Sequence, residues 1–236
     1  MRRGYISIMR SAISKTSIDA LGERLRGGNL SDDDLRQLDS YRRTFADAYE
    51  SVISAVRGLG LEPTGRPAKS TPAIVAKLRR GSIRLSQMQD IAGCRLVVDD
   101  RHHQDEAVHS LSKLFDQAVI NDRRARPSHG YRAVHVIVTI DSRTVEIQVR
   151  TTLQHIWAET CEKVSDITGT GIKYGMGTPV HRDIFDALSE YIAVFEEAYL
   201  EAPPVTEEQI LAQQELHSAI TTMIGSLSEA SWNDED

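Results

Sequence analysis

The sequence predicts a protein of the α+β or α/β class, with a sheet in the middle of the chain and helical extensions at both ends. Apolar residues recur at three- and four-residue spacing near the ends, whereas residues 93–150 contain the β-branched runs that are typical of strands. With 236 residues, of which 40% are hydrophobic, the chain is long enough to bury a large core. We therefore expect one sheet packed against helices.

Charge, cysteine content and hydropathy narrow the class of protein. The net charge is -6, so any surface that binds anions must be local. Cys94 and Cys161 are the only cysteines and fall in apolar segments, which indicates core thiols in a reducing compartment. We find neither a signal sequence nor an apolar run of membrane-spanning length, and therefore expect a cytoplasmic protein.

The first element that we expect is one long amphipathic helix. Leu35, Phe45 and Val56 belong to an apolar series at helical spacing. Ser31 is a suitable N-cap because three aspartates follow it, and Gly58 is a suitable stop. The helix therefore spans most of the chain between these two residues.

Basic side chains gather in the next segment, residues 64–80. Its sequence, TGRPAKSTPAIVAKLRR, predicts a polar loop that leads through a Thr71 cap and Pro72 into a short helix. A helix N-terminus suits phosphate binding, although a solvated basic helix is an equally simple interpretation of this segment taken alone. The candidate phosphate ligands are Arg66, Lys69, Lys77, Arg79 and Arg80. The segment is not a P-loop, because the second glycine of that motif is missing.

Strands and helices then alternate. We expect strands at residues 93–99, 130–140 and 143–150 and helices at the following segments: 102–115, 152–164, 181–200 and the stretch after the Thr206 to Gln209 capping box. Asp141 and Ser142 form the turn of a two-residue hairpin between the last two strands. Ile140 therefore pairs with Arg143, which fixes the register.

This register divides the hairpin into an aliphatic face and a polar face. The polar face carries Tyr131, Ala133, His135, Ile137, Glu146, Gln148 and Arg150. His135 lies directly opposite Gln148. A solvated sheet face needs no function, but such a face usually carries lysine, threonine and serine. An imidazole, a carboxylate, an amide and an aromatic ring together indicate a site.

Two carboxylates are candidate ligands for Mg²⁺, the ion that accompanies nucleotide phosphates. They are Glu146 and Asp90, which precedes the first strand. Asp90 alone would suit a cap or turn equally well. His102, Glu106 and His109 share a helical face, but without an HExxH motif we interpret them as a solvated surface.

Three segments resemble the synthetase domain of the RelA/SpoT family of nucleotide pyrophosphokinases. They are DIAGCR at residues 90–95, GYRAVH at residues 130–135 and VEIQVRT at residues 145–151. The typical segments of the family are DIAGxR, GYRSxH and VExQxRT, and the helix that begins with LQHIWAE follows them here as well. Three linked motifs in the same order are a specific signal.

The resemblance implies an α+β fold with a nucleotidyltransferase-like mixed β-sheet flanked by helices. It implies a synthetase core at residues 61–165, with helical extensions at residues 1–60 and 166–236. It also implies Mg²⁺-dependent transfer of pyrophosphate from ATP to a ribose 3′-hydroxyl. We expect a small synthetase without the hydrolase domain of the longer family members.

The resemblance also implies roles for individual residues. Asp90 matches the magnesium carboxylate of the family, and Glu146 matches the second acid, which helps to hold the metal or activates the hydroxyl. Tyr131 matches the tyrosine that stacks on the acceptor base. His135 and Gln148 match polar groups around the acceptor ribose and phosphates.

The loop over the ATP phosphates matches the family pattern in part. Lys69 and Ser70 correspond to its lysine and serine, and Lys77 corresponds to a later lysine. Pro67 stands where the family has the loop arginine, so that Arg66 is shifted by one position.

Two further departures are Ala73, which replaces a serine, and His129, which replaces the asparagine before GY.

Three functions stay open. A small alarmone synthetase would make ppGpp-type nucleotides from ATP and GDP or GTP. A toxin-type synthetase would modify the 3′ CCA end of tRNA and be restrained by an antitoxin. An inactive nucleotide-binding module would not need both acids. Arg123, Arg124 and Arg126 could hold phosphates of either acceptor.

Overall fold

The computed structural model describes residues 14–28, 30–169, 171–200 and five further positions, 211, 214, 215, 218 and 222. The predicted capping box from Thr206 to Gln209 lies outside these residues. Within the described part of the chain, none of the helices is long and apolar enough to cross a membrane.

A mixed sheet forms the centre of the fold. Its strands are β1 (Thr64–Arg66), β2 (Ala92–Val98), β3 (Val119–Asp122), β4 (Val134–Ile140) and β5 (Arg143–Thr151). They lie in the order β1-β2-β5-β4-β3, in which β2 and β5 are parallel and the other neighbours are antiparallel. The predicted α+β class with a mixed sheet is confirmed.

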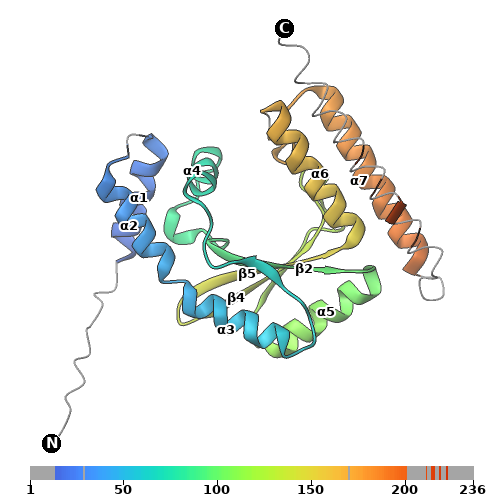
Figure 1. Ribbon diagram of the computed structural model, residues 1–236, viewed down its shortest axis with the longest axis horizontal. Coiled ribbons are helices and arrows are strands. Elements are labelled where there is room, and N and C mark those ends of the chain that lie inside the picture. The colour runs from blue at the N-terminus through green and yellow to red at the C-terminus, as the bar shows by residue number, and fades with distance from the viewer. Residues whose placement is uncertain are drawn as a thin grey trace, which may run out of the picture.

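Helices cover both faces of this sheet. They are α1 (Lys15–Gly27), α2 (Asp32–Arg43), α3 (Ala46–Arg57), α4 (Thr71–Arg80), α5 (Arg101–Leu114), α6 (Thr152–Thr168) and α7 (Pro179–Leu200), with short 3-10 turns η1 (Leu85–Gln87) and η2 (Ile172–Tyr174). Figure 1 shows α3 and α5 under the sheet, α4 and α6 on the opposite side, and α7 along the outer side of α6.

The hairpin register that we predicted is confirmed. Ile140 pairs with Arg143, and His135 pairs with Gln148. Asp141 and Ser142 have φ values of 47° and 64°, which are typical of the mirror-image turn of a two-residue hairpin. The turn therefore sets which side chains of β4 and β5 share a face.

The prediction of one long N-terminal helix is wrong, because the chain bends between α2 and α3. The Thr44 hydroxyl donates to the carbonyl of Tyr41 at 2.7 Å, and the backbone N–H of Thr44 donates to the same oxygen at 3.1 Å. Tyr41 and Phe45 stay buried on both sides of the bend. The apolar residues keep their helical spacing across the bend, so the periodicity of the sequence could not reveal it.

Two edge strands and the cap of α4 also differ from our expectations. β1 lies in the predicted loop, where Gly65 pairs with Cys94 so closely that a Cβ atom at residue 65 would lie 2.6 Å from the Cys94 Cα. β3 was not predicted, because a four-residue strand gives little alternation. Ser70, not Thr71, caps α4, with its hydroxyl accepting from the N–H of Ala73 at 3.4 Å.

One apolar core joins the N-terminal helices to the sheet. It runs from Ile18 and Leu21 of α1, which we had not predicted, through Val52 of α3 to Ile147 of β5. Both cysteines are buried and free, as expected of core thiols. The division of the chain at residues 60 and 165 stays a prediction.

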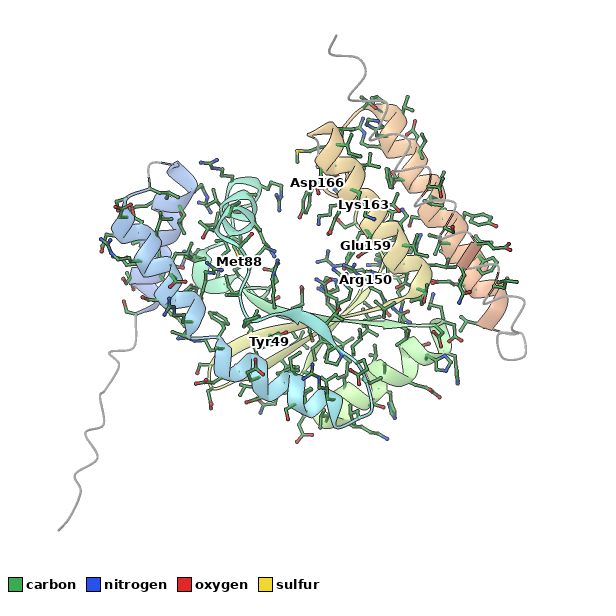
Figure 2. All side chains as sticks on the ribbon, in the orientation of Figure 1. Tyr49, Met88, Arg150, Glu159, Lys163 and Asp166 are labelled. Atoms are coloured by element: carbon green, nitrogen blue, oxygen red, sulfur yellow. The ribbon has the colours of Figure 1, made fainter. Side chains whose placement is uncertain are left out.

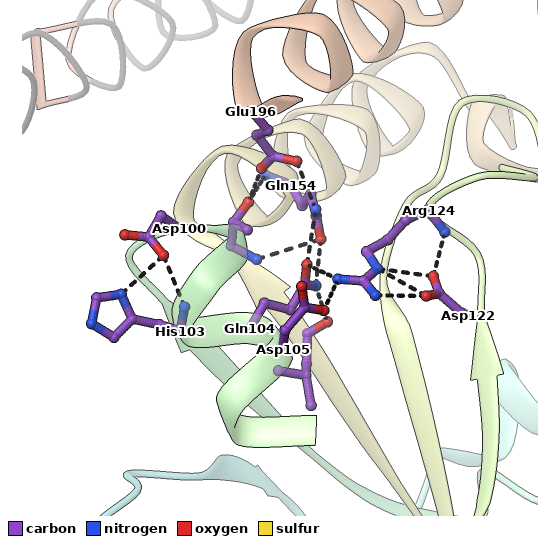
Figure 3. Close-up of polar contacts among 10 residues, drawn as sticks. Asp100, His103, Gln104, Asp105, Asp122, Arg124, Gln154 and Glu196 are labelled. Atoms are coloured by element: carbon purple, nitrogen blue, oxygen red, sulfur yellow. Dashed lines mark hydrogen bonds and ion pairs between the residues drawn. The ribbon is translucent and has the colours of Figure 1, made fainter. Parts of the chain in front are cut away.

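A buried polar network connects α5, α6 and α7 (Figure 3). Glu196 of α7 accepts hydrogen bonds from the Thr151 hydroxyl and from Nε2 of Gln154, the latter at 2.9 Å. Gln104 of α5 donates to Oε1 of Gln154 at 2.9 Å and accepts from Arg124 at 3.2 Å. Because each group has a partner, this network can lie between the helices without a large desolvation cost.

Glu196→Gln tests the charge inside this network. Burial raises the pKa of Glu196, so at a pH between the pKa of the unfolded chain and that of the folded protein, the folded protein keeps a proton that the unfolded chain has released. That stability is present at low pH and is lost as the pH rises through the raised pKa. Between about pH 5 and about pH 8 we expect the melting temperature of the variant to fall less than that of the wild type. The exposed neighbour Glu197→Gln is the control, and equal falls in all three proteins would contradict the prediction.

Candidate active site

A cavity of about 500 Å³ lies between α4 and α6, over β2 and β5. Figure 2 shows Glu159 on the side of α6 that faces α4, and Arg150 of β5 below it, close to the sheet. The charged side chains of the lining are Arg66, Lys69, Lys77, Arg80, Asp90, Arg95, Arg123, Glu146, Arg150, Glu162 and Lys173. Eight of them are cationic and three are acidic, in a chain whose net charge is -6. The lining therefore carries a local positive charge, which favours anions.

Asp90 lies at the α4 end of this cavity, between two lysines. The ammonium groups of Lys69 and Lys77 are each 2.8 Å from its carboxylate. A backbone hydrogen bond of 2.6 Å from Lys69 to the carbonyl of Ile91 holds the loop beside it. Burial alone would raise the pKa of Asp90, but the two ammonium groups outweigh burial and lower the pKa to about 2. Asp90 is therefore ionised.

Glu146 of β5 lies on the floor of the cavity. Gly93 pairs with it on β2, so no side chain of β2 stands beside the carboxylate at this position. His135 Nδ1 is 2.9 Å from Oε1, and Nε2 of Gln148 donates to Oε2 at 2.6 Å. Burial raises the pKa of Glu146, yet the hydrogen bonds from these two side chains outweigh it and the pKa is lowered.

Five side chains on this floor form a closed ring of hydrogen bonds. Arg150 Nη2 donates to the Tyr131 hydroxyl at 2.8 Å and to Oε1 of Gln148 at 2.7 Å. Because the Tyr131 oxygen already accepts from Arg150, its proton points to Nε2 of His135, 3.0 Å away. His135 then donates from Nδ1 to Glu146, which assigns its tautomer from its partners. Two paths of hydrogen bonds, one through Tyr131 and His135 and one through Gln148, thus connect the Arg150 cation to the Glu146 anion.

The turn that carries Tyr131 does not present His129 to the cavity. His129 has a φ of 50°, and its ring instead approaches Gly175, where a Cβ atom would lie 2.5 Å from His129 Cε1. Ser128 and Tyr131, on either side of the turn, do line the cavity. The departure from the family pattern at residue 129 therefore changes a packing contact.

The structure divides the predicted phosphate ligands into two groups. Those that line the cavity are Arg66, Lys69, Lys77, Arg80 and Arg123. Those that do not are Ser70, Arg79, Arg124 and Arg126. Ser70 caps α4, and Arg79 donates to the carbonyl of Arg26 at 3.3 Å. Arg124 pairs with Asp122 at 2.7 Å and with Asp105 at 2.6 Å, outside the cavity lining.

Three cations of the cavity are absent from the phosphate ligands that we predicted. Arg150 follows Gln148 by two residues on the same strand, so the hairpin register already placed it on the polar face. Arg95 lies on β2, where it pairs with Gln148 of the parallel strand β5. Lys173 comes from η2, where its ammonium lies 2.5 Å from Glu162, and no local pattern indicated it.

Asp90 and Glu146 are the residues that could hold a divalent cation. Both carboxylates line the same cavity. The negative charge of Asp90 partly opposes the lowering of the Glu146 pKa, so the two carboxylates are within electrostatic range of each other. No group of three or more His, Cys, Asp or Glu side chains in the described part of the chain could hold a metal ion. Two carboxylates fit Mg²⁺, which keeps several waters or phosphate oxygens as its other ligands.

Comparison with known proteins agrees with the motifs. Residues 65–166 match the model of the region found in RelA / SpoT proteins. This part of the chain is a RelA/SpoT domain. The uncharacterised protein Rv1366 of Mycobacterium tuberculosis is 36% identical over 170 residues, which are 68% of this chain and 62% of that protein. The probable chloroplastic GTP diphosphokinase RSH3 of Arabidopsis thaliana is 30% identical over 118 residues, 48% of this chain and 17% of that protein.

Solved structures share the fold of the RelA/SpoT domain. Small alarmone synthetase 1 from Bacillus subtilis, bound to its product pppGpp, superposes with a TM-score of 0.54 at 24% identity, over 70% of this chain and 96% of that one. The protein smu.1046c from Streptococcus mutans UA159 gives a TM-score of 0.50 at 25% identity, over 75% and 99% of the two chains. The predicted family resemblance is confirmed.

Tyr131→Phe tests the hydrogen-bond ring. Removing the hydroxyl leaves Nε2 of His135 and one N–H of Arg150 without this partner, so we expect the free energy of unfolding to fall by about 1–3 kcal/mol. Urea denaturation measures the change. Tyr41→Phe, which removes a hydroxyl without a hydrogen bond to the described residues, is the control. Equal stability of Tyr131→Phe and the wild type would show that the ring is not formed in solution.

Proposed function

We propose that the protein is a nucleotide pyrophosphokinase, which transfers pyrophosphate from ATP to the 3′-hydroxyl of a second nucleotide. The observation that carries this proposal is the cavity that combines eight cationic side chains with Asp90 and Glu146 in an acidic protein. Such a cavity attracts polyphosphates, whose oxygens bind lysine and arginine side chains. The RelA/SpoT domain supports the same reaction class.

The α4 end of the cavity is the proposed donor site. Four cations line it: Arg66 of β1, Lys69 just before α4, and Lys77 and Arg80 in the last turn of α4. Triphosphate oxygens would compete with Asp90 for Lys69 and Lys77, which frees the Asp90 carboxylate as the phosphates enter. Asp90 and Glu146 would then hold Mg²⁺, which supplies positive charge at the transferring phosphates when it is bound.

The reaction needs positioning more than covalent chemistry. The 3′-oxygen of the acceptor forms a bond to the β-phosphorus of ATP, while the bond between that phosphorus and the bridging oxygen of the α-phosphate breaks and AMP leaves. Glu146 is ionised and held by two side-chain donors, so it is placed to orient the hydroxyl and to accept its proton. Lys69 and Lys77 are placed to stabilise charge on the phosphates.

The opposite end of the cavity is the proposed acceptor site. Tyr131 presents an aromatic ring there, and Arg123 supplies a cation that has no carboxylate partner among the described residues. We propose a guanosine nucleotide, GDP or GTP, as the acceptor. The guanosine product of the Bacillus subtilis synthetase and the named GTP diphosphokinases support this choice.

Asp90→Asn and Glu146→Gln test the two acids. Each change removes a negative charge from the reacting centre and keeps the shape of the side chain, so we expect turnover to fall at least about a hundredfold. Nucleotide release from labelled ATP measures turnover, and circular dichroism checks the fold. Glu159→Gln, beside the cavity but outside its lining, is the control. A folded variant with near-normal turnover would remove that acid from the mechanism.

Labelled ATP identifies the acceptor. Purified protein is incubated with ATP labelled on its terminal phosphate, Mg²⁺, and in parallel with GDP, GTP, no acceptor or deacylated tRNA. The terminal phosphate travels with the pyrophosphate, so the acceptor becomes labelled. We expect label in the guanosine nucleotides. Label in tRNA alone would replace this proposal with a toxin-type synthetase, and bound ATP without any transfer would indicate an inactive nucleotide-binding module.

A further inference from the structure

The turn that brings Tyr131 into the cavity is held from behind by α7. Ser128 and Tyr131 close the turn with two backbone hydrogen bonds of 3.4 Å and 3.1 Å. The Ser189 hydroxyl of α7 donates to the carbonyl of Gly130, at the tip of the turn, at 2.6 Å. Ser189 is only 2% exposed, so water does not compete for this bond.

Arg132, the residue after Tyr131, is a second connection to α7. Its Nε donates to the Ser189 hydroxyl oxygen at 3.0 Å, and its Nη2 donates to Glu190 at 2.6 Å. Its Nη1 donates to the carbonyl of Arg124 on the other side of the loop. Ser189 thus uses its donor for the turn and its acceptor for Arg132, and one hydroxyl joins both parts of the loop to α7.

The turn is a tight two-residue turn of the same kind as the one at Asp141 and Ser142. His129 and Gly130 have φ values of 50° and 77°, so both central residues are in the left-handed region. Gly130 is packed so closely that a Cβ atom would lie 2.7 Å from a ring carbon of Trp157. Neither Ser189 nor Arg132 lines the substrate cavity, so any effect of these residues on substrates must pass through the turn.

We propose that Ser189 and Arg132 are positioning residues for the acceptor site. They fix the turn on α7 and thereby set the place of the Tyr131 ring over the cavity floor. α7 follows the RelA/SpoT domain in the chain, so this helix outside the domain contributes to acceptor affinity. The inference rests on the proposed function in one respect, the assignment of the Tyr131 end of the cavity to the acceptor.

Ser189→Ala removes the hydroxyl that joins the turn to α7. We expect the KM for the acceptor to rise about tenfold and the KM for ATP to change less than about twofold, because the donor site lies at the other end of the cavity. Arg132→Gln keeps a polar side chain but loses the contacts of the guanidinium with Ser189, Glu190 and the carbonyl of Arg124. It should likewise raise the KM for the acceptor and leave the KM for ATP nearly unchanged. Thr44→Ala removes a comparable hydroxyl–carbonyl bond in the bend between α2 and α3, and is the control for general loss of stability.

Hydrogen exchange of the Tyr131 amide supplies a readout that does not depend on turnover. We expect faster exchange at residues 128–131 in Ser189→Ala than in Thr44→Ala. An equal rise of both KM values, or unchanged exchange in the turn, would overturn the positioning role. If the wild type transfers no pyrophosphate, the proposed function fails, whereas the exchange measurement still decides whether Ser189 holds the turn.

Discussion

The register of the β4–β5 hairpin determines which side chains of these two strands lie on the cavity floor. Asp141 and Ser142 close the hairpin in two residues, and side chains then alternate between an aliphatic face and the cavity floor. A slip by one residue would turn Glu146 into the aliphatic core and expose Val145 instead. Burial of a carboxylate among aliphatic side chains is costly, so both faces favour the same register.

The parallel pairing of β2 with β5 places the proposed donor site, which includes Asp90, next to the cavity floor. Gly93 lies opposite Glu146 and leaves room above it, and Asp90 precedes the strand at the same end. The lysines around Asp90 compensate its burial, much as His135 and Gln148 compensate the burial of Glu146. The two acids are therefore kept ionised by different partners. Both are carboxylates that could bind a cation or accept a hydrogen bond from a hydroxyl.

What could be predicted from the sequence depended on local signals. The hairpin, its register and the pair of acids could be derived, because alternation and a two-residue turn act over a few positions. The bend at Thr44 keeps the apolar phase, and the short strand β3 gives little alternation, so neither was apparent. Lys173 and Ser189 reach the site region through tertiary packing, which no local pattern encodes.

Calorimetric titration of two variants tests most directly whether the cavity has a donor end and an acceptor end. Lys77→Ala and Tyr131→Ala are each titrated with a non-hydrolysable ATP analogue and with GDP. Lys77→Ala should weaken binding of the analogue at least about tenfold and binding of GDP less than about twofold, whereas Tyr131→Ala should do the reverse. Equal losses of both nucleotides in both variants would contradict the division of the cavity and indicate one undivided polyphosphate site.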